Sequence, residues 1–180
     1  MKDSPIEDLF QKANDERGGL EKLLDKLPGF GGYLEKGRRR EADRMLRSTI
    51  SSRLEEVRLE ISGIHQTLSR DIILAMDHAE ALGEVDTRLM GLISKINDAP
   101  EGYAGWFDAV KVQEDDLARV YQFDAGMMDF VDEIAAKANV LEDAVENGGD
   151  VGAATRELNK SVQTANSAFA KRNEVILGIS

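Results

Sequence analysis

Hydrophobic residues recur along most of this chain at spacings of three and four residues, the period of an α-helix. The clearest run has a mean spacing of about 3.7 residues, which excludes the period-two pattern of a strand. A weaker continuation of the run reaches Ile96. The run consists of ten positions: Leu46, Ile50, Leu54, Val57, Ile61, Ile64, Leu68, Ile72, Met76 and Ala79.

The segment 37–98 is therefore helical, either as one helix or as two. One straight helix would be about 90 Å long. Two antiparallel helices of about 30 residues would match the neighbouring segments in length, so we expect a bend within 69–84. Ser69 could cap a new helix there, or Gly83 could end one. No strong turn signal marks the place of the bend, so one continuous helix and two helices both remain possible.

A second helical pattern covers 109–178 and is predicted to be a hairpin that turns at 147–149. Asn147-Gly148-Gly149 breaks the helix, and Asp150 is a good N-cap for the next one. Folding the chain about Gly148 places positions whose numbers add to 296 opposite each other. Each half of the hairpin has one stripe of mainly hydrophobic residues at spacings of three and four, and each stripe contains one charged residue. These two residues, Asp124 and Arg172, then face one another.

The beginning of the chain predicts one further helix. Ser4-Pro5-Ile6-Glu7 is a capping box with Pro at the first helical position, and Pro28-Gly29 ends the segment, so we expect a helix over 5–27. Two glycine-aromatic loops follow, at 28–36 and at 99–108. Together the segments predict one all-α domain over 1–180, an antiparallel four-helix bundle of coiled-coil-like long helices with an additional N-terminal helix.

Composition removes several classes of function. The 180 residues include no Cys and only two His, which excludes disulfide scaffolds and thiolate metal sites. No apolar run is long enough to span a membrane, and the start lacks the apolar stretch of a secretory signal, so we expect a cytoplasmic protein. The net charge of −11 disfavours nucleic-acid binding.

The charge is unevenly distributed along the chain. Residues 36–58 have a net charge of +4, whereas 77–150 have a net charge of −13. The simplest interpretation is that a basic helix packs beside an acidic one within the fold.

Candidate catalytic and metal chemistry is weak. A di-metal carboxylate bundle needs Glu-x-x-His on two helices, but Ser62 precedes His65 and Ala75 precedes His78 at that spacing. The acidic residues between 114 and 133 also lack calcium-loop spacing. We therefore assign no catalytic, cofactor-binding or metal-binding residue, expect no cofactor and do not expect an enzyme.

Two candidate sites remain. The first is a cluster of aromatic and Arg residues from the two glycine-aromatic loops, which a bend near 70 would bring to the same end of the bundle. It either docks a partner or membrane surface, or closes the open end of the core. The aromatic–arginine patch consists of Phe30, Tyr33, Arg38, Arg39, Arg40, Tyr103, Trp106 and Phe107.

The second candidate is the Asp124–Arg172 pair, which we interpret as a structural buried ion pair that fixes the hairpin register. These features favour a non-enzymatic, soluble helical scaffold or adaptor that binds another protein or self-associates. The alternative is a peripheral membrane-associated or stress-related coiled-coil protein that binds anionic lipid. A more distant alternative is a small-molecule or metal-binding bundle that uses Asp124, Tyr121 and Arg172.

Overall fold

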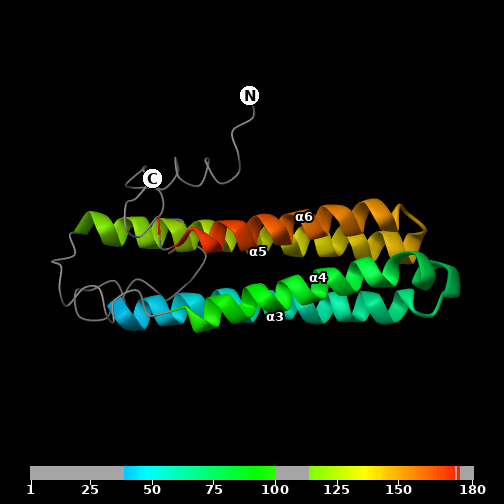
Figure 1. Cartoon of the computed structure of the whole chain (residues 1–180), viewed down its shortest axis with the longest axis horizontal. Helices are drawn as coiled ribbons and strands as arrows, with labels where there is room; N and C mark the ends of the chain where they lie inside the picture. Colours follow the sequence, from blue (N-terminus) through cyan, green and yellow to red (C-terminus); the bar gives the residue numbers. More distant parts are fainter. Residues whose placement is uncertain (1–38, 100–113, 173, 175–180) are drawn as a thin grey trace, which may run out of the picture.

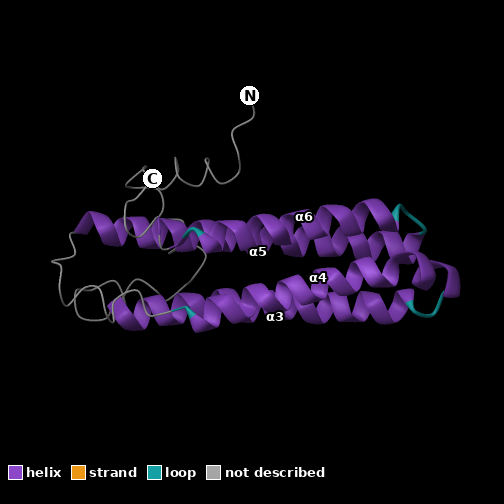
Figure 2. Ribbon diagram, viewed as in Figure 1, coloured by secondary structure: helices purple, strands orange, loops and turns teal. Residues whose placement is uncertain are grey.

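The computed structural model describes residues 39–99, 114–172 and 174 of the chain. Four α-helices account for most of them: α3 (Arg39–Leu68), α4 (Ile72–Asp98), α5 (Glu114–Asn147) and α6 (Val151–Ala170). This part of the chain contains no strand (Figure 2), which confirms the all-helical class for the described residues. The predicted helix over 5–27, the loop over 28–36 and residues 100–108 of the second loop lie outside the described residues.

The chain reverses between α3 and α4 over residues 69–71, inside the range 69–84 where the bend was expected. The N-cap of α4 is Asp71, whose carboxylate accepts hydrogen bonds from the backbone amides of Ile73 and Leu74 at 2.9 and 3.2 Å. The expectation that Ser69 caps this helix was wrong, because its hydroxyl donates back to the His65 carbonyl oxygen at 2.7 Å. Gly83 does not end a helix either and lies within α4.

Exchanging the cap should destabilise the protein measurably. Asp71→Ala removes the acceptor for two amides at the start of α4, so we expect a loss of about 1 kcal/mol in the free energy of unfolding. Ser69→Ala removes a hydroxyl only two residues away and should change that free energy by less than about 0.5 kcal/mol. Urea unfolding followed by circular dichroism measures both. Equal losses would contradict the assignment of Asp71 as the cap.

The second hairpin turns at 148–150, one residue later than the predicted 147–149, because Asn147 still belongs to α5. Gly148 has a φ of 76°, a left-handed conformation that a residue without a Cβ adopts at little cost. Asp150 caps α6 as its sequence position predicts, with its carboxylate accepting from the Ala153 amide at 2.8 Å.

The four helices pack as two hairpins laid side by side (Figure 1). The main contacts join α3 to α4, α5 to α6, α4 to α6, and α3 to α5, so α4 and α5 lie diagonally across the assembly although they follow one another in the chain. The contacts Arg88–Asn159 and Lys95–Asn166 advance by seven residues on both helices, so α4 runs parallel to α6, and α3 likewise runs parallel to α5 (Figure 1). The helices that join the two hairpins are therefore parallel, unlike those of the predicted antiparallel bundle. The turns at 69–71 and 148–150 therefore share one end.

One hydrophobic core runs between the helices. In α3 every described member of the predicted stripe up to Leu68 is buried. Beyond Leu68 the predicted stripe does not mark buried positions. Ile72 and Met76 are exposed, and the buried positions of α4 begin at Leu82. The three residues of the turn shift the helical phase, which turns the start of α4 away from the core. The core positions of α4 are Leu82, Val85, Leu89, Leu92 and Ile96.

The basic helix does contact acidic neighbours. Arg53 of α3 lies 3.2 Å from Asp132 of α5, and Arg58 lies 3.2 Å from Asp86 of α4. Hydrogen bonds to Glu55 and Asp86 raise the pKa of the Arg58 guanidinium. These pairs are partly exposed, so each contributes little to stability. They nevertheless place opposite charges next to each other where α3 meets α5 and where α3 meets α4.

Candidate functional site

Most of the predicted aromatic–arginine patch lies outside the described residues. Arg39 and Arg40 are the first two residues of α3, at the same end of the assembly as the end of α4 (Figure 1), but their side chains are not described. The patch therefore stays a prediction. The members outside the described residues are Phe30, Tyr33, Arg38, Tyr103, Trp106 and Phe107.

The structure brings Asp124 and Arg172 together. Arg172 Nε lies 3.8 Å from Asp124 Oδ1, and the two side chains are only 3% and 1% exposed. The side chain of Tyr121, which was expected nearby, is not described.

A third buried charge was missed by sequence reasoning. Arg47 of α3 is 6% exposed, and its Nη1 donates to the backbone carbonyls of Ile96, at 3.5 Å, and Ala99 at the end of α4. Carbonyl groups at a helix C-terminus carry partial negative charge, so a cation is favoured there. The available signal was weak: Arg47 follows the core residue Leu46 in a helix with many arginines. Buried in this way, the three charged residues suit a structural role better than ligand binding.

The surface between α4 and α6 has a different character. Residues 87–97 and 158–172 contain five basic residues and no carboxylate, in a chain with 34 acidic residues. Because α4 and α6 are parallel neighbours, the structure places these two segments side by side (Figure 1). We call this surface the acid-free band. Its basic residues are Arg88, Lys95, Lys160, Lys171 and Arg172, of which Arg172 is buried.

A groove of about 420 Å³ lies within the acid-free band, and we call it the α4–α6 groove. Two basic residues of α4, Arg88 and Lys95, lie along one side, with Gly91 between them. The facing residues of α6 are Gln163, Asn166 and Ser167.

Asparagine side chains of α6 hold both cations in place. Arg88 donates to the Asn159 side-chain carbonyl, and Lys95 Nζ donates to the Asn166 side-chain carbonyl at 3.0 Å. Asn166 in turn donates to the backbone carbonyl oxygens of Arg88 and Val162, at 3.3 and 3.2 Å, which fixes its orientation. Both asparagines are neutral, so these contacts position the cations without adding negative charge.

Of the two groove cations, Arg88 pairs with a carboxylate of the described residues. Glu84 lies 3.4 Å from Arg88, one turn back along α4, and its side chain is largely exposed. Lys95 has no carboxylate within 4 Å among the described residues. The groove therefore presents two cations about 10 Å apart, the rise of seven helical residues. Amide and hydroxyl groups lie opposite them.

Gly91 makes this groove open. A Cβ added at Gly91 would meet nothing within 4 Å, so the absent side chain leaves space rather than serving tight packing. Glycine in a helix interior also costs about 1 kcal/mol relative to Ala. Space bounded by two cations and several hydrogen-bonding side chains suits carboxylate-bearing ligands.

In the described part of the chain, no group of three or more His, Asp or Glu side chains could hold a metal ion. None of the described helices is long and apolar enough to cross a membrane. Comparisons with protein-family models, curated proteins and solved structures gave no match.

Proposed function

We propose that this chain is a non-enzymatic scaffold or adaptor, built as a four-helix bundle of two antiparallel hairpins, that binds an acidic helix of a protein partner in the α4–α6 groove. The observation that carries the proposal is the acid-free band, where Arg88 and Lys95 are held by α6 asparagines beside the open space at Gly91. The acid-free band is positively charged, although the chain as a whole has a net charge of −11.

The spacing of the cations favours a helix as the ligand. Arg88 and Lys95 are seven residues apart, so they lie about 10 Å apart along one face of α4. Carboxylates at positions i and i+7 of a partner helix have the same rise and share one face. A single phosphate group is too small to engage both cations at that separation.

The test uses alanine-rich helical peptides of about 20 residues, long enough to form a helix in water. One peptide carries Glu at i and i+7, a second carries Gln at those positions, and a third carries Glu at i and i+5, on different faces. We expect the first to bind the full chain about tenfold more tightly than the other two. Higher salt should weaken the difference.

Three variants locate the binding. Arg88→Gln with Lys95→Gln should remove the preference for the i, i+7 peptide. Gly91→Leu should block the groove while leaving thermal stability equal or higher, because its Cβ enters open space. Gly83→Leu is the matched control, since Gly83 is an equally open position on the same helix, outside the groove.

Two results would contradict the proposal. The first is equal affinity for the Glu and Gln peptides, measured by isothermal titration calorimetry. The second is equal loss of binding in Gly91→Leu and Gly83→Leu. Binding to phosphatidylserine vesicles that Gly91→Leu abolishes, without peptide binding, would instead favour the lipid-surface alternative.

A further inference from the structure

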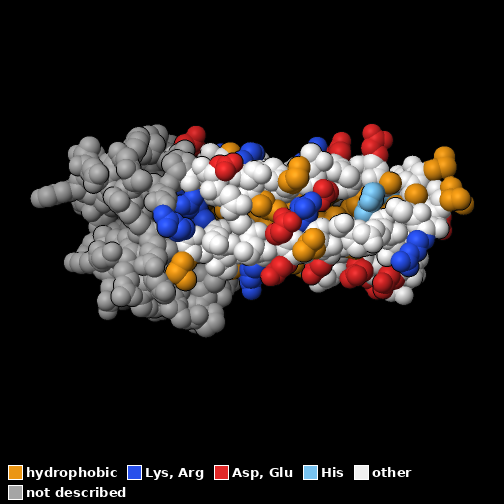
Figure 3. Space-filling model, turned by 90° about the horizontal axis from the view of Figure 1, so that it is seen from below, with side chains coloured by type: hydrophobic (Ala, Val, Ile, Leu, Met, Phe, Trp, Pro, Cys, Tyr) orange, Lys and Arg blue, Asp and Glu red, His pale blue; other side chains and the backbone are white. Residues whose placement is uncertain are grey.

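A cluster of exposed apolar side chains forms the end of the assembly where α3 turns into α4 (Figure 3). Ile72, Ile73 and Met76 are 76%, 72% and 83% exposed, and they lie in the first two turns of α4, directly after the Asp71 cap. We call these three residues the apolar tip. It lies more than three helical turns before Arg88 along α4 and outside the α4–α6 groove.

The apolar tip is not part of the core. The fully buried positions of α4 begin at Leu82, and the neighbours Leu74 and Ala75 already pack partly against the core. Other exposed large apolar residues, such as Leu59, Met90 and Val140, stand singly on different helices or turns, which is ordinary for a protein surface. Three such residues grouped on a projecting turn are characteristic of an interaction site.

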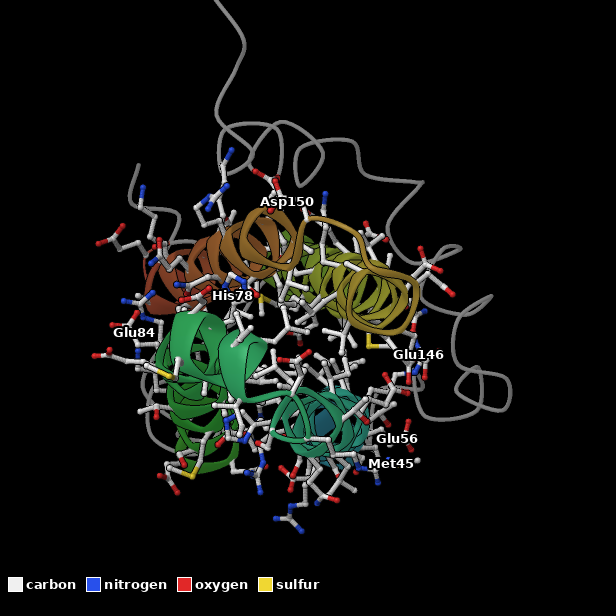
Figure 4. The ribbon with its side chains drawn as sticks, turned by 90° about the vertical axis from the view of Figure 1, so that its right-hand side faces the viewer. Met45, Glu56, His78, Glu84, Glu146 and Asp150 are labelled. Carbon is white, nitrogen blue, oxygen red and sulfur yellow. The ribbon has the colours of Figure 1, made fainter. Side chains whose placement is uncertain are left out.

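The end of the assembly that carries the apolar tip is acidic. Residues 69–80 and 142–157, which form this end, contain eight carboxylates and two arginines, a net charge of −6. Figure 4 looks onto this end and shows Glu146 and Asp150 on the second hairpin, with His78 between α4 and α6. Asp71 and Asp150 use their carboxylates as helix caps, and the other six acidic residues are exposed, with Glu157 3.8 Å from Lys137.

We propose that the apolar tip packs against the apolar face of an amphipathic helix of a protein partner, with Lys and Arg flanking that face. Charge complementarity selects this occupant, because like charges would oppose a second copy meeting end to end. An anionic lipid surface would be repelled for the same reason. This contact does not depend on the α4–α6 groove, and the two surfaces together would let the chain bridge an acidic helix and a basic partner.

The probe is a synthetic amphipathic helix of about 20 residues with one Leu face and flanking Lys residues. We expect the full chain to bind it, and the variant Ile72→Ser, Ile73→Ser, Met76→Ser to bind about tenfold more weakly. The matched control, Leu59→Ser, Met90→Ser, Val140→Ser, removes three exposed apolar side chains elsewhere and should bind within about twofold of the wild type. Both variants should keep the wild-type melting temperature, since no core residue changes.

Four results would overturn the proposal. Equal binding by the two triple variants would show that the peptide responds to charge alone. A wild-type dimer in sedimentation velocity that the tip variant dissociates would identify a second copy as the occupant. Co-sedimentation with phosphatidylserine vesicles that depends on the tip would identify lipid. If the double variant Arg88→Gln with Lys95→Gln no longer binds the Leu–Lys peptide, the peptide binds in the α4–α6 groove and not at the tip. If the double variant still binds the peptide, the apolar tip acts independently of the proposed function.

Discussion

Arg172→Met should reduce the free energy of unfolding by about 3–5 kcal/mol, because it removes a guanidinium that lies 3.8 Å from a buried carboxylate. The Asp124 side chain is 1% exposed, so water cannot replace the lost charge without opening the helices. Urea unfolding at neutral pH measures the loss. Lys171→Met is the matched control: it removes the neighbouring cation, which is exposed, and should change the same free energy by less than about 0.5 kcal/mol.

The same variant should show a specific pH dependence. A buried carboxyl group without its cation binds a proton more tightly in the folded state than in the unfolded chain, so the stability of the variant should fall as pH rises. The difference from the wild type should therefore be smallest in acid, where the carboxyl is protonated in both states. A difference that stays constant from neutral to acidic pH would contradict burial of the charge.

A double variant tests whether the two residues act together. Asp124→Leu with Arg172→Met should recover much of the loss, because apolar side chains of similar size often replace a buried ion pair at little cost. A double variant as unstable as the two single changes combined would show that the residues do not interact energetically.

The local part of this fold can be predicted from the sequence. The period of the α3 stripe identifies the helix and the face that is buried up to Leu68. In the second hairpin, Gly148 and Asp150 mark the turn, and the one charged residue in each stripe places Asp124 opposite Arg172. Each inference needs only residues that are close in sequence or related by one reversal of the chain.

Two features of the fold could not be predicted from the sequence: the rotation of α4 about its axis after the turn, and which helices of the two hairpins pack against each other. The hydrophobic stripe continues through Ile72 and Met76, but the three-residue turn rotates the start of α4, so these side chains face outward. Besides α3, the helix that α4 contacts is α6 rather than α5, and no local sequence pattern indicates this. The α4–α6 groove therefore combines side chains 71 residues apart, as in the Lys95–Asn166 hydrogen bond. The signal that was available, two stretches without carboxylates, acquires meaning only once those stretches are neighbours.

Leu54→Ala should cost about 2–5 kcal/mol of unfolding free energy, the range for removing a buried leucine side chain and leaving a cavity. Leu54 is completely buried in the core, whereas Leu59, five residues later on α3, is 62% exposed. Leu59→Ala is therefore a control of the same chemistry on the same helix. It should change stability by less than about 0.5 kcal/mol, and alanine's higher helix propensity offsets part of any loss. Parallel urea titrations of the two variants separate burial from helix propensity, because propensity changes equally in both. Equal effects would mean that the stripe through Leu54 does not face the core, and the packing of α3 against α4 and α5 would have to be reassigned.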